Sequence, residues 1–150
     1  MTDEPAARRR LLLALAAAVV AVQVALVLTT FIPAPHNGGD NAGYITLARS
    51  LLEGRYVDLW DPTTPPHTKY PPVFPAVLAV WIAAGAATWT ALKSVPALFT
   101  VLSVVLAYLW AARRRGPLFG AAVALLFGVS RAVLWSSHWI LSDPTFVALT

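Results

Sequence analysis

Long stretches without a charged side chain alternate with short clusters of charge along this chain, and this pattern limits its fold more than any other feature. The first stretch, residues 11–32, has only Gln23, Thr29 and Thr30 as polar side chains. As a helix its 22 residues would extend about 33 Å, enough to cross a bilayer. Charged residues make up 12% of the chain, whereas a typical soluble domain carries roughly 25%. The sequence therefore predicts a membrane protein.

The first stretch is flanked by Arg8, Arg9 and Arg10 on one side and by Pro33 on the other. A cleaved secretory signal also begins with basic residues, but its apolar core is only about 7 to 15 residues long. We therefore expect an uncleaved membrane anchor. Because basic residues that flank a span stay in the cytoplasm, the arginines should lie inside and the chain from Pro33 onward outside.

Three more apolar segments follow, at residues 71–92, 95–112 and 117–135. If all three cross the bilayer, the arginine triplet at 113–115 lies outside, against the positive-inside rule. If residues 71–92 form an interfacial or re-entrant helix instead, the triplet lies inside, and Asp40 and Asp143 share the outer face. We favour this second topology, because three arginines in a short loop are a strong orientation signal. The predicted fold class is an all-α, polytopic membrane helical protein.

Residues 33–70 form a predicted external loop that is rich in acids, histidine and proline. Within it we expect a short amphipathic juxtamembrane helix, which Asp40 or Asn41 caps and Gly54 ends. Its apolar stripe has helical spacing and consists of Ile45, Ala48, Leu51 and Leu52. Such a helix would lie along the membrane surface. The segment that follows, residues 61–72, is too rich in proline for helix or sheet.

The last residues, 144–150, begin a further apolar helix. Because a membrane helix cannot end after one or two turns, we interpret residues 1–150 as the N-terminal part of one longer membrane-embedded domain, inactive alone. The sequence has no cysteine, which excludes disulfides, a thiolate nucleophile and a Cys-based zinc site. It has no basic stripe interleaved with aromatics, so no nucleic-acid partner is expected. It also has no Gly-rich phosphate loop, which argues against a nucleotide sugar as direct donor.

Several loop residues could carry chemistry. A helix N-terminus would keep Asp40 ionised, so that it could accept a proton from an attacking hydroxyl; the alternative is a helix cap only. Lys69 lies just before the chain re-enters the membrane, where a cation can bind a lipid phosphate or simply mark the interface. His67 could assist phosphate binding. Tyr70 is either part of this substrate site or, like Trp60, an interfacial anchor.

Asp143 is the second acidic candidate, because an acid between apolar segments is expensive to bury; the alternative is a cap of the next helix. Arg131 could pair with Asp143, hold an anionic ligand, or reach to the interface. His36 with Asp40 or His67 makes a poor metal site in both count and spacing, so no metal and no cofactor are expected.

These features follow one another in a recognisable order. An anchor leads outward, "GDNAGYITLARSLLEGR" and "PPHTKYPPVFP" follow, and an Arg-rich turn "WAARRRG" precedes an apolar helix that ends in "SSHWILSDPTF". This order resembles the N-terminal part of the membrane-embedded type C (GT-C) glycosyltransferases. The bacterial members related to the protein mannosyltransferases and to the aminoarabinose transferase of lipid A are the most similar. The resemblance covers nearly the whole chain and rests on the order and spacing of the features.

The resemblance implies a multi-pass protein of the bacterial inner membrane. Its donor would be a polyprenyl-phosphate sugar, and its acceptor a hydroxyl of a lipid, glycan or protein on the outer face. By position, Asp40 matches the family's general base, Lys69 the cation at the donor phosphate, and Asp143 a supporting acid of the second external loop. Many relatives have two adjacent acids in the first loop, whereas Asp40 is followed by Asn41, which argues against metal coordination.

A transporter or other non-enzymatic membrane subunit is the alternative, because it would also show several spans and intramembrane charges. Transporters place such acids near the bilayer midplane, whereas Asp40 and Asp143 are expected at the outer boundary. An anomeric phosphate is a good leaving group once a cation neutralises it, so one base, one or two cations and a water-poor cleft suffice. We therefore favour the transferase, with Asp40 and Asp143 flanking the donor in a shared cleft.

Overall fold

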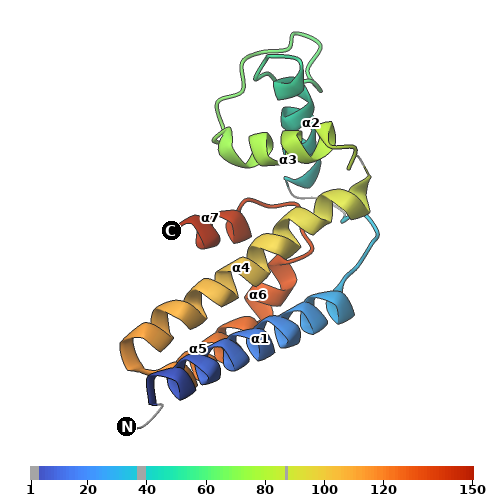
Figure 1. Ribbon diagram of the computed structural model, residues 1–150. Helices are drawn as coiled ribbons and strands as arrows, with labels where there is room; N and C mark the ends of the chain where they lie inside the picture. The colour runs from blue at the N-terminus through green and yellow to red at the C-terminus, as the bar shows by residue number, and fades with distance from the viewer. Residues whose placement is uncertain (1–3, 37–39, 87) are drawn as a thin grey trace.

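A computed structural model describes residues 4–36, 40–86 and 88–150. Within these ranges the fold is all-α, as expected, with no strand and one isolated bridge between Val57 and Pro66. The seven helices in chain order are α1 (Glu4–Thr30), α2 (Asn41–Leu52), α3 (Val73–Ala83), α4 (Trp89–Arg115), α5 (Pro117–Gly128), α6 (Arg131–Ser136) and α7 (Asp143–Leu149) (Figure 1). Two of them, α1 and α4, are long and apolar enough to cross a membrane.

The two long helices run antiparallel. Near one end, the Tyr108 hydroxyl of α4 donates to the Leu12 carbonyl of α1 at 2.8 Å. At the other end, the Lys93 ammonium of α4 donates to the Ile32 carbonyl, just beyond α1, at 2.6 Å. Both arginine triplets therefore lie at the same end of the molecule, where the N-terminus and the α4–α5 turn meet (Figure 1).

Helix α3 connects the loop to α4 without running the length of the long helices. Its 11 residues extend about 16 Å, roughly half a hydrocarbon core. It is shorter than a membrane span, as the second topology requires for residues 71–92, and that topology itself stays a prediction. The boundaries differ, however, because a turn at Gly85 (φ 95°) ends the segment early, and the Thr88 hydroxyl, which accepts from the Ala91 amide at 3.2 Å, starts α4 at Trp89.

The prediction of a single helix over residues 117–135 is wrong, since the structure has two helices there. α5 ends at Gly128, and α6 begins at Arg131. The Ser130 hydroxyl accepts from the Val133 amide at 3.4 Å and so caps α6. The other boundaries also shift: α1 begins before the first arginine triplet, and α4 extends through the second.

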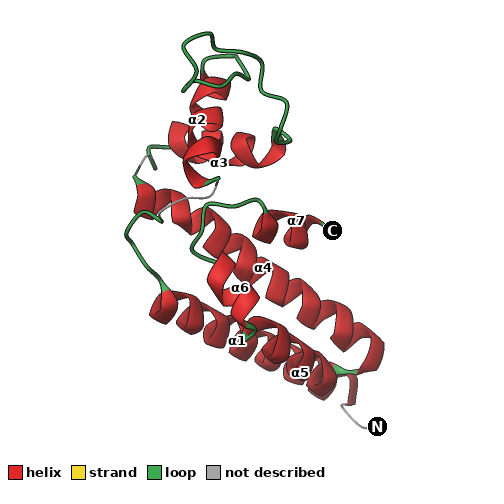
Figure 2. Cartoon of the chain, turned by 180° about the vertical axis from the view of Figure 1, so that it is seen from behind, coloured by secondary structure: helices red, strands yellow, loops and turns green. Residues whose placement is uncertain are grey.

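The headpiece, defined here as residues 40–83, contains α2, α3 and the loop between them, and it lies beyond one end of the long helices (Figure 2). A helix is confirmed where the sequence predicts the short amphipathic one, as α2, and Gly54 follows it with a φ of 73°. The apolar face of α2 packs against protein, because Ile45 belongs to the same core cluster as Phe74 and Leu78 of α3. Leu52 of the predicted stripe is exposed.

The bundle, defined here as α1, α4, α5 and α6, is packed closely where α5 meets α4. Gly120 of α5 approaches α4 so closely that a Cβ there would lie 2.7 Å from the Ala112 Cβ and 2.8 Å from the Tyr108 carbonyl. Large apolar side chains nevertheless remain exposed on its outer faces, among them Leu28, Leu118 and Leu126. α7 packs against α4 beside the bundle.

Candidate functional site

The headpiece carries an open cavity of about 500 Å³ between the start of α2 and the proline-rich loop. Its lining residues are Asp40, Ala42, Gly43, Thr46, Asp58, Trp60, His67, Thr68, Lys69 and Tyr70. Four of the six site residues predicted from sequence, Asp40, His67, Lys69 and Tyr70, are therefore brought together here. This cavity is the candidate functional site.

An acid and a cation face one another in this cavity. The Lys69 ammonium lies 3.7 Å from a carboxylate oxygen of Asp40, with the two side chains 70% and 45% exposed. Asp40 stands at the N-cap position of α2, but its side chain makes no capping hydrogen bond. Its carboxylate is therefore not committed to the helix, contrary to the alternative in which Asp40 only caps it.

Tyr70 holds this pair in place. Its ring lies 4.5 Å below the Lys69 ammonium and packs 4.8 Å from the ring of Tyr44. Hydrogen bonding to Tyr70 and the charge of Asp40 raise the pKa of Lys69, so the ammonium keeps its charge. Partial burial and the hydrogen bond to Asp40 raise the pKa of Tyr70, so its phenol stays a protonated donor at neutral pH.

His67 is engaged within the protein through both ring nitrogens. Its Nδ1 pairs with the Asp58 carboxylate, and its Nε2 accepts from the Tyr70 amide at 2.9 Å. The ring is buried and stacks on the Tyr70 ring at 5.2 Å. The arrangement leaves no nitrogen for the phosphate contact expected of His67; the ring instead fixes the backbone that carries Lys69 and Tyr70.

Asp58 is a site residue that the sequence reasoning missed. It lies nine positions before His67, and only the isolated bridge between Val57 and Pro66 brings the two together. No spacing rule for a helix or strand predicts that contact. The only sequence signal that could have pointed to Asp58 was the presence of an acid and a histidine in the same loop.

Asp143 and Arg131 lie in other cavities. Asp143, the first residue of α7, is exposed and lines a cavity of about 380 Å³ between α4, α6 and α7. Arg131, the first residue of α6, lines another of about 390 Å³. The expected shared cleft of Asp40 and Asp143 is therefore absent from the described residues. The neighbouring residue Ser142 nevertheless reaches α2, where its hydroxyl lies 3.1 Å from that of Tyr44.

Lys93 is the second residue that the sequence reasoning missed. It is fully buried in the first turns of α4, and its ammonium donates to the carbonyls of Ile32 and Ala34, which follow the end of α1. A cation is favoured beside the free carbonyls at a helix C-terminus. Its isolation between the uncharged segments 71–92 and 95–112 was a signal that could have found it.

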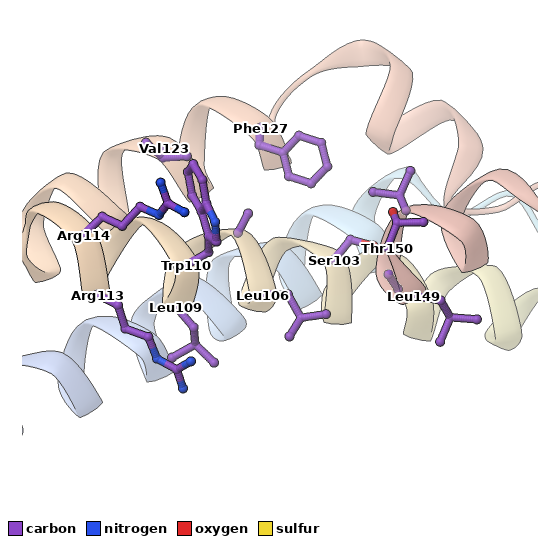
Figure 3. Close-up of a pocket in the computed structure, with 13 residues that line it drawn as sticks. Ser103, Leu106, Leu109, Trp110, Arg113, Arg114, Val123, Phe127, Leu149 and Thr150 are labelled. Carbon is purple, nitrogen blue, oxygen red and sulfur yellow. The ribbon is translucent and has the colours of Figure 1, made fainter.

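The largest of these cavities, about 750 Å³, lies at the arginine-rich end of the bundle and contains none of the predicted site residues (Figure 3). It runs along α4 between α5 and α7, with Trp110, Phe127 and Leu149 on its walls. The Arg114 guanidinium lies 4.5 Å from the Trp110 ring at one end. The cavity is mostly apolar and holds no acid, so it offers no group for proton transfer.

Among residues 4–36, 40–86 and 88–150, no three side chains of His, Asp or Glu gather as metal ligands. Comparison with known proteins adds no relative: no protein-family model, curated protein or solved structure matches this chain. Its function is therefore inferred from its own residues and geometry.

Proposed function

We propose that this chain forms part of a membrane-embedded glycosyltransferase, which moves a sugar from a polyprenyl-phosphate donor to an acceptor hydroxyl on the outer face of the membrane. The observation that carries the proposal is the pair of Asp40 and Lys69 in one open cavity, 3.7 Å apart. A base and a phosphate-binding cation side by side are the groups that this transfer requires.

The placement of the cavity supports a reaction at the outer face. The headpiece lies at the end of the long helices opposite both arginine triplets (Figure 1). With α1 and α4 crossing a bacterial inner membrane and the triplets inside, the positive-inside rule puts the headpiece outside. Nucleotide sugars are cytoplasmic, so a lipid-linked sugar phosphate is the donor class available there.

The pair supports transfer by exchange of partners. Lys69 leaves Asp40 to bind the donor phosphate, which is inexpensive because both groups are exposed. The freed Asp40 carboxylate accepts the proton of the acceptor hydroxyl as its oxygen attacks the anomeric carbon. The bond from that carbon to the phosphate oxygen breaks, and its electron pair leaves with the polyprenyl phosphate. Attack opposite the leaving group inverts the anomeric centre.

Tyr70 and His67 have supporting parts in this proposal. The protonated Tyr70 phenol donates to the donor phosphate beside Lys69. His67 and Asp58 are positioning residues, because they hold the loop through the Tyr70 amide. Asp143 and Arg131 receive no role in this cavity, since they line other ones.

The test is sugar transfer by the full-length protein in membrane vesicles, assayed with polyprenyl-phosphate-linked hexoses and pentoses. Asp40→Asn removes the base and should lower kcat by about 10²- to 10⁴-fold without changing membrane insertion. Asp61→Asn is the matched control, because Asp61 is an acid of the same loop that binds Thr63 and does not line the cavity.

Lys69→Ala should raise the apparent KM for the lipid donor by about tenfold while changing the KM for the acceptor little. An unchanged donor KM removes Lys69 from the phosphate site. Retention of native turnover by Asp40→Asn, or no turnover of any polyprenyl-phosphate sugar by the native protein, contradicts the proposal.

A further inference from the structure

A separate cavity of about 390 Å³ lies where the end of α1 meets the break between α5 and α6. Its lining residues are Thr30, Ile32, Val129, Arg131, Leu134, Trp135 and His138. It shares none of them with the Asp40 cavity and includes no acid. Basic and aromatic side chains here stand beside an apolar wall.

Arg131 supplies the charge of this cavity. It is exposed and forms no ion pair within the part of the chain that the structure describes. A guanidinium offers several N–H donors in a planar fork that matches the oxygens of a phosphate. An arginine without a carboxylate partner, at the edge of a cavity, is suited to an anionic ligand.

His138 supplies a buried acceptor. The Ser137 hydroxyl donates to the Leu134 carbonyl at 2.7 Å, so towards His138 Nδ1, 3.4 Å away, it can only accept. Nδ1 therefore carries the ring proton and Nε2 the lone pair. Burial, together with the charges of His36 and Lys93, lowers the pKa of His138, which keeps the ring neutral at pH 7.

This acceptor is unsatisfied within the protein. His138 is only 3% exposed, and its Nε2 has no hydrogen-bond partner among the described residues. A buried acceptor without a partner destabilises the fold unless a bound group supplies a donor. The segment is nevertheless well fixed, because the His36 ring stacks on Trp139 at 4.2 Å and its Nε2 lies 3.1 Å from the His138 carbonyl.

The surroundings favour a ligand that is part of a lipid. Val129 and Trp135 are both about half exposed and line the cavity beside Ile32. In the membrane placement proposed above, this cavity opens near the outer boundary of the bilayer, the depth at which tryptophan is enriched. Arg131 would then stand at phosphate level, and the apolar wall would face the first carbons of the lipid chains.

We infer that this cavity binds the headgroup of an anionic glycerophospholipid whose phosphodiester carries hydroxyl groups, as in phosphatidylglycerol. Arg131 donates to the phosphate, and His138 Nε2 accepts a hydrogen bond from a headgroup hydroxyl. The inference rests on the membrane placement within the proposed function, but not on sugar transfer. The site is distinct from the one proposed for the glycosyl donor.

The first test is lipid binding to the purified full chain in neutral detergent, measured by native mass spectrometry. The probes are phosphatidylglycerol, phosphatidylmethanol and phosphatidylcholine with identical acyl chains. Phosphatidylmethanol keeps the anionic phosphodiester but lacks the hydroxyls, so it should bind about fivefold more weakly than phosphatidylglycerol. Phosphatidylcholine, which has no net charge, should bind most weakly.

Arg131→Gln should weaken phosphatidylglycerol binding by about tenfold. Arg114→Gln is the matched control, since it removes the same charge at the opposite end of the bundle and should leave binding unchanged. Equal losses in the two variants, or no loss in Arg131→Gln, overturn the inference and leave the transferase proposal standing.

The His138 variants test the hydroxyl contact. His138→Phe should abolish the preference for phosphatidylglycerol over phosphatidylmethanol, whereas His138→Gln keeps an acceptor oxygen and should retain part of it. A preference that persists in His138→Phe overturns the assigned contact.

Two competition experiments test the identity of the ligand. Competition by soluble glycerol phosphate at the same concentration would identify a free-phosphate site instead. Displacement of phosphatidylglycerol by polyprenyl phosphate would assign the cavity to the glycosyl donor. Either result contradicts the inference.

Discussion

The headpiece and the bundle use their apolar side chains in different ways. The headpiece buries its own: Tyr44, Phe74 and Leu78 form one core with Leu92 of α4, and the loop is tied down by side-chain hydrogen bonds. The bundle leaves residues such as Leu126 largely exposed. Burial against protein stabilises the first, whereas the exposed apolar faces of the second are of the kind that mark membrane or protein contact sites. The candidate site lies in the part with its own core.

The largest expected effect contrasts the two parts directly. Phe74 is 1% exposed in the headpiece core, so Phe74→Ala should lower the free energy of unfolding by about 3 to 5 kcal/mol. Leu126→Ala in the bundle, at a side chain 74% exposed, should change it by less than about 0.5 kcal/mol. Denaturant titration in mixed micelles measures both, and similar values for the two variants would remove the distinction.

The second prediction concerns the contact between α5 and α4 in the bundle. Gly120→Ala should lower the free energy of unfolding by about 1 to 3 kcal/mol, because the new Cβ would meet the Tyr108 carbonyl and the Ala112 amide of α4. Gly128→Ala is the control: its Cβ would meet chiefly the end of the Gln23 side chain, which can move. The same titration should rank Gly120→Ala as the more harmful change.

The third prediction concerns the headpiece loop. Asp58→Asn removes the charged partner of His67 and loosens the backbone that carries Lys69 and Tyr70. It should raise the KM for the lipid donor about fivefold with a smaller change in kcat. A large loss of kcat at unchanged KM would instead give Asp58 a direct part in the chemistry.

The smallest expected effect is a dependence of stability on pH, and it comes from two histidines at the junction of the headpiece and the bundle. Burial lowers the pKa values of His36 and His138, so the folded state resists protonation that the unfolded chain accepts. Stability should therefore be full above the unfolded histidine pKa of about 6.5 and decline as the pH falls below it. Thermal unfolding at pH 7.5 and 5.5 measures this decline, and the double variant His36→Phe, His138→Phe should reduce it.

Sequence patterns predicted those parts of the fold that depend on local periodicity. The helical spacing of Ile45 and Ala48, followed by Gly54, correctly predicted α2. The length of the first apolar stretch correctly predicted α1. The break at Ser130 was missed, because a serine in a long apolar segment is compatible with either a continuous helix or a new cap.

The sequence predicted those residues of the candidate site that lie next to the ends of helices. Asp40 at the start of α2 and Lys69 before α3 were both identified, and their pairing follows from the way the loop folds back. Asp58 was missed, and Asp143 lines a different cavity from the one expected, since their positions depend on a loop bridge and on the packing of α7. Such long-range contacts leave no local periodic signal.

The burial of Lys93 also has a consequence for biogenesis. Among the described residues its ammonium donates only to carbonyls that follow α1, so in the proposed membrane placement α4 without α1 would bring an uncompensated charge into the bilayer. If the proposed placement holds, the two helices are expected to enter the bilayer together rather than one after the other.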